Sequence, residues 1–92
     1  MALLTGKQVA AQLKAAKGWE LIGDEIRRSF VHKDFVRAMG FVHSVALLAE
    51  RMNHHPDIDI RWNKVTLALS THSAGGLTEK DFALAKQINA LV

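Results

Sequence analysis

The residues of this chain with the greatest capacity for chemistry are three histidines in two short motifs. His54 and His55 are adjacent and precede Pro56, and His72 follows Thr71 further along the chain. Imidazole changes its charge near neutral pH and is also a common metal ligand. The chain contains no cysteine, so thiolate ligands and a cysteine nucleophile are excluded. The two motifs therefore leave metal binding and histidine acid–base catalysis as the chemistries to weigh.

A zinc site is the first interpretation of three histidines, but their spacing argues against it. Two ligands on one helix usually stand at i and i+4, whereas adjacent residues such as His54 and His55 point about 100° apart. Glu50 and His54 do stand four apart, and that pair equally suits a carboxylate that orients an imidazole. No serine lies in a Gly-x-Ser-x-Gly turn, which disfavours a nucleophilic triad. We therefore expect acid–base catalysis by His54, His55 and His72, with no metal and no cofactor.

The other two histidines, His32 and His43, are expected to be structural. His32 ends a predicted strand, and His43 lies among apolar residues in the middle of a predicted helix. The three motif histidines instead fall where predicted elements meet loops, and side chains in such places can converge on a ligand.

The first elements that must hold these histidines follow from hydrophobic periodicity. Thr5 is a good N-cap for a helix that ends at Gly18. Residues 19–32 then predict two short strands that fold back on each other at Gly23-Asp24. The first third of the chain is therefore a helix followed by a hairpin.

A second helix leads directly to the first histidine motif. Asp34 is its predicted N-cap, and Pro56 ends it, because the residue before a proline avoids the helical region. One apolar face of this helix consists of Phe35, Met39, Val42, Ala46 and Ala49.

A second hairpin and a third helix hold the second motif. Residues 57–63 and 64–72 both alternate between apolar and polar side chains, and we expect the turn between these strands at Asn63-Lys64. A loop follows, and Thr78 and Asp81 then have the spacing of a capping box. The last helix is expected to carry Phe82, Ala85, Ile88 and Leu91 inward.

The element order α-β-β-α-β-β-α predicts an α+β fold, a four-stranded antiparallel sheet with three helices on one face. The 92 residues form one domain, residues 1–92. The net charge is only +3 and the basic residues are scattered, so we expect no direct nucleic-acid partner. We also expect no membrane partner and a cytoplasmic protein, since no stretch approaches the roughly 18 apolar residues of a span or resembles a signal peptide.

Two segments closely resemble the pterin-4a-carbinolamine dehydratases, also called 4a-hydroxytetrahydrobiopterin dehydratases. They are "GWELIGDEIRRSFVHKDFVRAMGFVHSVA" and "AERMNHHPDIDIRWNKVTLALSTHSAGGLTEKDFALA". The resemblance covers residues from about Thr5 to Leu91. It implies the same α+β fold and the loss of water from a 4a-hydroxytetrahydropterin, which gives the quinonoid dihydropterin. That reaction recycles the cofactor of aromatic amino-acid hydroxylases, so such a hydroxylase is a candidate partner.

The resemblance also assigns site residues. Those that line the pterin site are His54, His55, Pro56, Thr71, His72, Ser73 and Ala74. Glu50, Trp62 and Asp81 are candidates for supporting positions around it, Asp81 being first a capping residue. The chain departs from the family pattern at Trp62, where many relatives have tyrosine, and at Asn53, where an acidic residue is common.

The chemistry suggests how the histidines divide the work. The leaving hydroxyl needs a proton, and the neighbouring nitrogen must lose one, so the two groups should come from separate elements. We expect His54 and His72 to transfer the protons, while His55 and the Thr71 backbone position the pterin. The sequence leaves open which of His54 and His72 is the acid.

An alternative function is a protein-binding module, a dimerisation cofactor of a transcription regulator, as in some members of the family. The second helix favours some association, because it is apolar over more than half its circumference. That excess equally fits self-association, and we expect a homo-oligomer, either a dimer or a tetramer.

Overall fold

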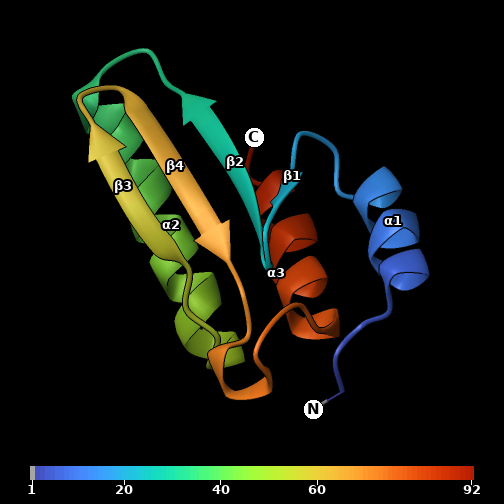
Figure 1. The fold of residues 1–92 in the computed structure, drawn as a ribbon. Helices are drawn as coiled ribbons and strands as arrows, with labels where there is room; N and C mark the ends of the chain where they lie inside the picture. The colour runs from blue at the N-terminus through green and yellow to red at the C-terminus, as the bar shows by residue number, and fades with distance from the viewer. Residues whose placement is uncertain (1) are drawn as a thin grey trace.

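The computed structural model describes residues 2–92 and contains three α-helices, four strands and one short 3₁₀ helix (Figure 1). In chain order these are α1 (Gly6–Ala15), β1 (Glu20–Ile22), β2 (Glu25–Val31), α2 (Phe35–Met52), β3 (Asp57–Arg61), β4 (Lys64–Leu69), η1 (His72–Ala74) and α3 (Glu79–Asn89). The predicted order α-β-β-α-β-β-α is confirmed, and η1 is an addition that the sequence did not predict.

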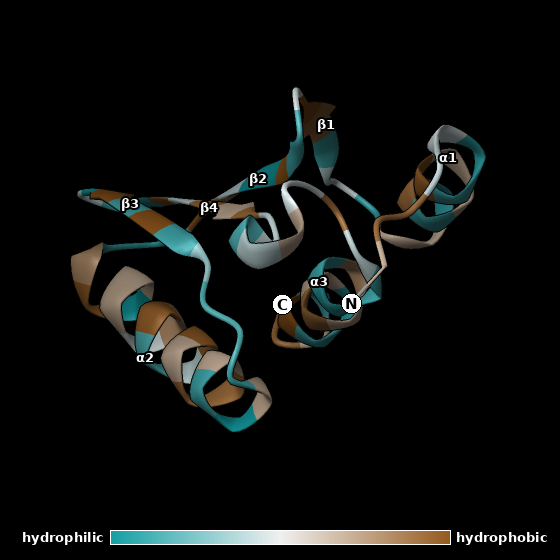
Figure 2. Ribbon diagram, turned by 60° about the horizontal axis from the view of Figure 1, so that its bottom comes forward, coloured by the Kyte–Doolittle hydropathy of each residue, from teal (hydrophilic) through white to brown (hydrophobic). Residues whose placement is uncertain are grey.

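The four strands form one antiparallel sheet in the order β1-β2-β4-β3. The two hairpins therefore join through their inner strands, β2 and β4. Figure 2 shows α1, α2 and α3 on the same side of this sheet, with α3 between the other two helices. The prediction of one sheet with the helices on one face is confirmed.

The turn between β3 and β4 lies one residue earlier than predicted. Arg61 pairs with Lys64, so the turn consists of Trp62 and Asn63 rather than Asn63 and Lys64. Trp62 has a φ of 52°, in the left-handed region that two-residue hairpin turns require and that tryptophan seldom adopts. That unusual choice of residue explains why the pattern of side chains misplaced the turn.

The core lies between the sheet and the helices. The buried apolar side chains of the strands are Ile26, Phe30, Val65, Leu67 and Leu69. Those of α3 are Phe82, Leu84, Ala85 and Ile88. Trp19 is also part of the core at 5% exposure, and its indole N–H donates to Asn89 Oδ1 at 2.9 Å. Leu91, which was expected to point inward, follows the end of α3 and is 42% exposed.

The buried face of α2 matches the apolar face named from the sequence only in part. The fully buried side chains are Ala38, Phe41, Val45 and Ala49. Val42 packs partly buried against the core, whereas Phe35, Met39 and Ala46 are exposed. Because the helix is apolar on most sides, its periodicity did not fix which face turns inward. Two of the four buried residues are alanines, and such small side chains allow a helix to approach its neighbours closely.

Capping residues set where the three helices begin, and the end of α2 and the start of α3 both border the candidate site. Thr5 and Asp34 accept hydrogen bonds from the first turns of α1 and α2, as predicted. The capping box of Thr78 and Asp81 at α3 is also present. The C-terminus of α2 departs from prediction: the helix ends at Met52, four residues before Pro56, and Asn53 is its C-cap. Within residues 2–92, no helix combines the length and the apolar character that a membrane span requires.

Candidate active site

Four polar side chains meet in the interior, where the end of α2, the segment after β4 and the start of α3 converge (Figure 1). We call His54, Thr71, Thr78 and Asp81 the carboxylate cluster. His54 Nε2 lies 2.5 Å from Asp81 Oδ1. Asp81 Oδ2 accepts two hydrogen bonds, one from the Thr71 hydroxyl at 2.8 Å and one from the Thr78 backbone N–H at 2.9 Å. The hydroxyl oxygens of Thr71 and Thr78 are 2.8 Å apart.

The end of α2 turns His54 toward this cluster. Asn53 adopts a left-handed conformation with a φ of 51°, which asparagine tolerates better than most residues because its short polar side chain bonds locally. The backbone N–H of His54 then donates to Ala49 O at 3.0 Å. The chain therefore folds back over the last turn of α2, and the His54 side chain is left only 10% exposed.

A closed loop brings Thr71 to Thr78. The backbone N–H of Thr71 donates to Gly76 O at 2.8 Å, and Gly75 has a φ of 78° that suits glycine. These features close the segment that contains η1. The N-terminal segment supports the loop from the other side, since the Leu4 N–H donates to Leu77 O at 2.9 Å. Thr78 then begins α3 as its N-cap.

The cluster compensates the charge of a carboxylate that is 0% exposed. A buried carboxylate is costly unless hydrogen bonds and partial charges replace its water. Asp81 meets His54, the Thr71 hydroxyl and the Thr78 backbone N–H, and it lies in the first turn of α3, where the helix dipole favours negative charge. The arrangement can hold an imidazole at a fixed orientation.

The other candidate residues lie at the surface beside this cluster. His55 Nε2 is 3.1 Å from Glu50 Oε2, and these side chains are 56% and 79% exposed, so solvent screens the pair strongly. His72 and Ser73 are exposed on η1, directly after Thr71, and Ala74 is half-buried. Pro56, also half-buried, leads from His55 into β3.

The structure therefore joins the two histidine motifs through Asp81, which contacts His54 from the first motif and Thr71 from the second. It does not bring Trp62 to this place. Trp62 is 67% exposed and follows the far end of β3, whereas His54 precedes the near end. Sequence reasoning missed the role of the Thr78 side chain, although its position as N-cap beside Asp81 was visible.

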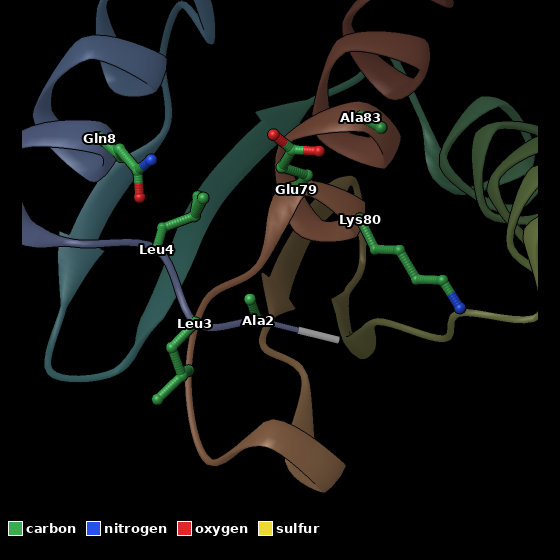
Figure 3. Close-up of a pocket in the computed structure, with 7 residues that line it drawn as sticks. All are labelled: Ala2, Leu3, Leu4, Gln8, Glu79, Lys80 and Ala83. Carbon is green, nitrogen blue, oxygen red and sulfur yellow. The ribbon is translucent and has the colours of Figure 1, made fainter.

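A cavity with a volume of about 530 Å³ lies between the N-terminal segment and the first turns of α3. Figure 3 shows its lining residues Leu3 and Leu4 on the N-terminal segment and Glu79 and Ala83 on α3. None of the four cluster residues lines it. Within residues 2–92, no three His, Asp or Glu side chains are placed to hold a metal ion together.

Comparison with known proteins decides the family. The family model described as pterin 4 alpha carbinolamine dehydratase matches residues 2–91. The chain belongs to this family. A protein of Roseiflexus castenholzii that is assigned by name to the pterin-4-alpha-carbinolamine dehydratases is 54% identical over 91 residues, which are 99% of this chain and 98% of that protein. A protein of Acidobacterium capsulatum with the same assigned name is 54% identical over 92 residues and covers 100% of both chains.

Solved structures agree with this membership. The crystal structure of a transcriptional coactivator/pterin dehydratase from Brucella melitensis has a TM-score of 0.93 and 40% identity, and covers 97% of each chain. A pterin dehydratase-like protein described as a RuBisCO assembly factor in the alpha-carboxysome has a TM-score of 0.65 and 22% identity. It covers 79% of this chain and 84% of its own, and at that identity it shares the fold alone.

Proposed function

We propose that this family member is a hydro-lyase that dehydrates pterin-4a-carbinolamine, also called 4a-hydroxytetrahydropterin, to quinonoid dihydropterin. Full-length relatives at about 50% identity support the reaction. Within the site, the proposal rests on the buried contact between His54 and Asp81. An imidazole that is oriented by a carboxylate is suited to transfer a proton at neutral pH.

The reaction requires two proton transfers and no change of oxidation state in the overall balance. The bond between C4a and its hydroxyl oxygen breaks, and the oxygen leaves as water after it gains a proton. The neighbouring ring nitrogen loses its proton, and its electron pair forms the new double bond to C4a. His54 and His72 are the groups we assign to these transfers, because the two events occur on different sides of one C–N bond and these histidines come from different segments of the chain.

The remaining site residues bind the pterin in this proposal. His55, Pro56, Ser73 and Ala74 flank the two proton-transfer histidines in sequence and lie at or near the surface. The Thr71 hydroxyl is already bonded inside the carboxylate cluster, so its backbone is the part that remains for the substrate. A pterin-dependent aromatic amino-acid hydroxylase is the proposed functional partner, since its turnover would supply the carbinolamine.

Steady-state kinetics of histidine variants test the assignment. In an assay coupled to such a hydroxylase, the decay of the carbinolamine absorbance should be faster with this protein than without it. His54→Ala and His72→Ala should lower kcat by about 10² or more, up to the limit that the uncatalysed reaction sets. His55→Ala should mainly raise KM, because it removes a contact that binds the substrate and the transition state equally. His43→Ala, an exposed histidine of α2, is the matched control and should behave as wild type.

The His54/His72 double variant gives the decisive result. If it turned over like the wild type, the two histidines would not be the proton-transfer groups. If the wild-type protein itself failed to speed the decay of the carbinolamine, the dehydratase function would be wrong for this chain.

A second candidate function is association through α2. Its exposed apolar side chains include Val36 at 78%, Leu47 at 62% and Phe35 at 49% exposure. Such a face favours a partner, and we propose a second copy of this chain, which gives a dimer or tetramer. A transcription regulator is the alternative occupant, in line with the coactivator description of the Brucella melitensis relative. A stable complex with such a regulator, in a protein without dehydratase turnover, would reverse this order.

A further inference from the structure

The protons of the carboxylate cluster can be assigned from its donors and acceptors. An ionised carboxylate only accepts hydrogen bonds. The Thr71 hydroxyl and the Thr78 backbone N–H both donate to Asp81 Oδ2, which favours the ionised form of Asp81. At the 2.5 Å contact with Asp81 Oδ1, the proton therefore belongs to His54 Nε2.

The same count gives the contact between the two threonines a direction. A hydroxyl has one proton and two acceptor lone pairs. The Thr71 hydroxyl donates its one hydrogen bond to Asp81, so at the 2.8 Å contact with Thr78 the Thr71 oxygen must be the acceptor. Thr78 is therefore the donor, and the chain of protons runs from Thr78 to Thr71 to Asp81. Both threonines are buried, at 6% and 0% exposure, so water does not compete for these bonds.

This direction has a consequence for the reacting atom of His54. In neutral imidazole one ring nitrogen is a donor and the other an acceptor. A hydrogen bond donated by one nitrogen therefore leaves the lone pair on the other. With Nε2 protonated toward Asp81, the lone pair of His54 lies on Nδ1. Among residues 2–92 the only buried side-chain nitrogen or oxygen without a partner is His32 Nε2, and no protein group bonds to His54 Nδ1. Nδ1 is therefore open to solvent or substrate.

We propose that Thr71 and Thr78 are positioning residues for the dehydration: their hydroxyls hold Asp81 in the orientation that keeps His54 in its Nε2–H tautomer and presents Nδ1 to the pterin. This inference rests on the proposed function for its catalytic consequence, whereas its statement about the tautomer concerns the protein without substrate. A purely structural role for the two threonines would affect stability and leave the tautomer of His54 unchanged.

Nitrogen NMR of histidine-labelled protein reads the tautomer directly, without substrate. In wild-type spectra recorded at a pH where the His54 signals are those of neutral imidazole, His54 should show the Nε2–H form. Thr71→Val removes the hydroxyl that donates to Asp81, and Thr78→Val removes the donor to Thr71. Both should produce a detectable Nδ1–H population at His54, larger in Thr71→Val, and the serine variants Thr71→Ser and Thr78→Ser should restore the wild-type spectrum.

Kinetics of the same proteins connect the tautomer to the reaction. Thr71→Val should lower kcat roughly tenfold and Thr78→Val by less, with KM within about twofold of wild type, because one hydrogen bond to a charged group is lost. Thr5→Val is the matched control, since Thr5 also caps a helix through a capping box but lies far from the cluster in sequence and is exposed. It should lose stability and retain kcat.

Three results would overturn the inference. The first is a wild-type His54 in the Nδ1–H form, which decides the matter even if the valine variants do not fold. The second is a Thr71→Val spectrum identical to that of the wild type. The third is a Thr71→Val kcat equal to wild type in a protein that turns over. If the wild type shows no turnover, the proposed function fails, and the two spectroscopic results still decide the role of the threonines.

Discussion

Asp81→Asn is the substitution that tests the site most sharply, because it keeps the shape of the side chain and removes its charge. Asp81 meets three donors, from Thr71, Thr78 and His54. An asparagine amide has one accepting oxygen and one donating NH₂ group. If the oxygen serves Thr71 and Thr78, the NH₂ group faces His54 Nε2. That nitrogen must then accept, so the proton of the neutral imidazole moves to Nδ1 and the reacting lone pair is lost.

The size of the kinetic effect follows from this inverted tautomer. Loss of a general acid or base typically costs about 10²–10⁴-fold in rate. A tetrahydropterin nitrogen can expel the hydroxyl partly unaided, so the uncatalysed dehydration limits how large a loss can be seen. We therefore expect kcat of Asp81→Asn to fall about 10²-fold, near the low end of that range, with a smaller change in KM.

The expected loss of stability can also be worked from the contacts. Hydrogen bonds to a charged group contribute about 1.5–3 kcal/mol and those between neutral groups about 0.5–1.5 kcal/mol. Three bonds to Asp81 change from the first kind to the second, and α3 loses about 0.3–1 kcal/mol of interaction between the charge and the helix dipole. A neutral amide is easier to bury than a carboxylate, which offsets part of this. The net loss should be about 1–3 kcal/mol.

The assay is the coupled dehydration measured beside urea unfolding, with Asp34→Asn as the control. Asp34 is also a capping carboxylate at the start of a helix, but it is bonded to Arg37 at the surface and lies outside the site. Because asparagine is itself a good N-cap, Asp34→Asn should cost less than about 1 kcal/mol and leave kcat unchanged. Turnover of Asp81→Asn within threefold of wild type would show that the orientation of His54 does not matter to the reaction.

Three further predictions concern metal, assembly and the end of α2. Exhaustive chelation should leave activity unchanged; a loss that zinc restores would contradict this. Light scattering at micromolar concentration should give a mass of at least twice the 10.2 kDa chain, and Val36→Glu should lower it; a wild-type mass near that of one chain would refute association. Asn53→Ala should destabilise by about 1 kcal/mol and Asn53→Gly should not, because only the alanine is strained at a φ of 51°; equal melting temperatures would argue against that strain.

Local signals made most of the fold predictable from the sequence. Thr5, Asp34 and Thr78 act within one helical turn, so their capping roles could be recognised without knowledge of the tertiary structure. The alternation in residues 64–72 likewise indicated the strand β4, in which Val65, Leu67 and Leu69 are buried. The buried face of α2 was not determined in this way. A helix that is apolar on most sides can turn several faces inward, and only packing against β4 and α3 selects Ala38, Phe41, Val45 and Ala49.

The site was predictable in its residues and not in its connections. The two histidine motifs stand out by residue type, and the capping position of Asp81 was recognised. The contact between His54 and Asp81 joins residues 27 positions apart, and no periodicity reports on such a distance. The hydroxyl of Thr78 was missed because an N-cap threonine is already explained by its helix. Its contact with Thr71 depends on the loop that η1 and Gly75 close.

Asp81 links folding to function because its two oxygens serve different elements. Oδ2 satisfies the backbone at the start of α3, and Oδ1 meets the imidazole that follows the end of α2. The first turn of α3 cannot form fully without setting the position of Oδ1, so the cap and the orientation of His54 arise together. Among residues 2–92 no side chain gives His72 comparable support, and its side chain is exposed on η1. The two histidines that we propose as proton-transfer groups therefore differ in preorganisation: His54 is held by Asp81 before substrate arrives, and under this proposal His72 would be ordered by the pterin itself. That difference would make His54→Ala costly mainly in kcat, while His72→Ala would affect kcat and KM together.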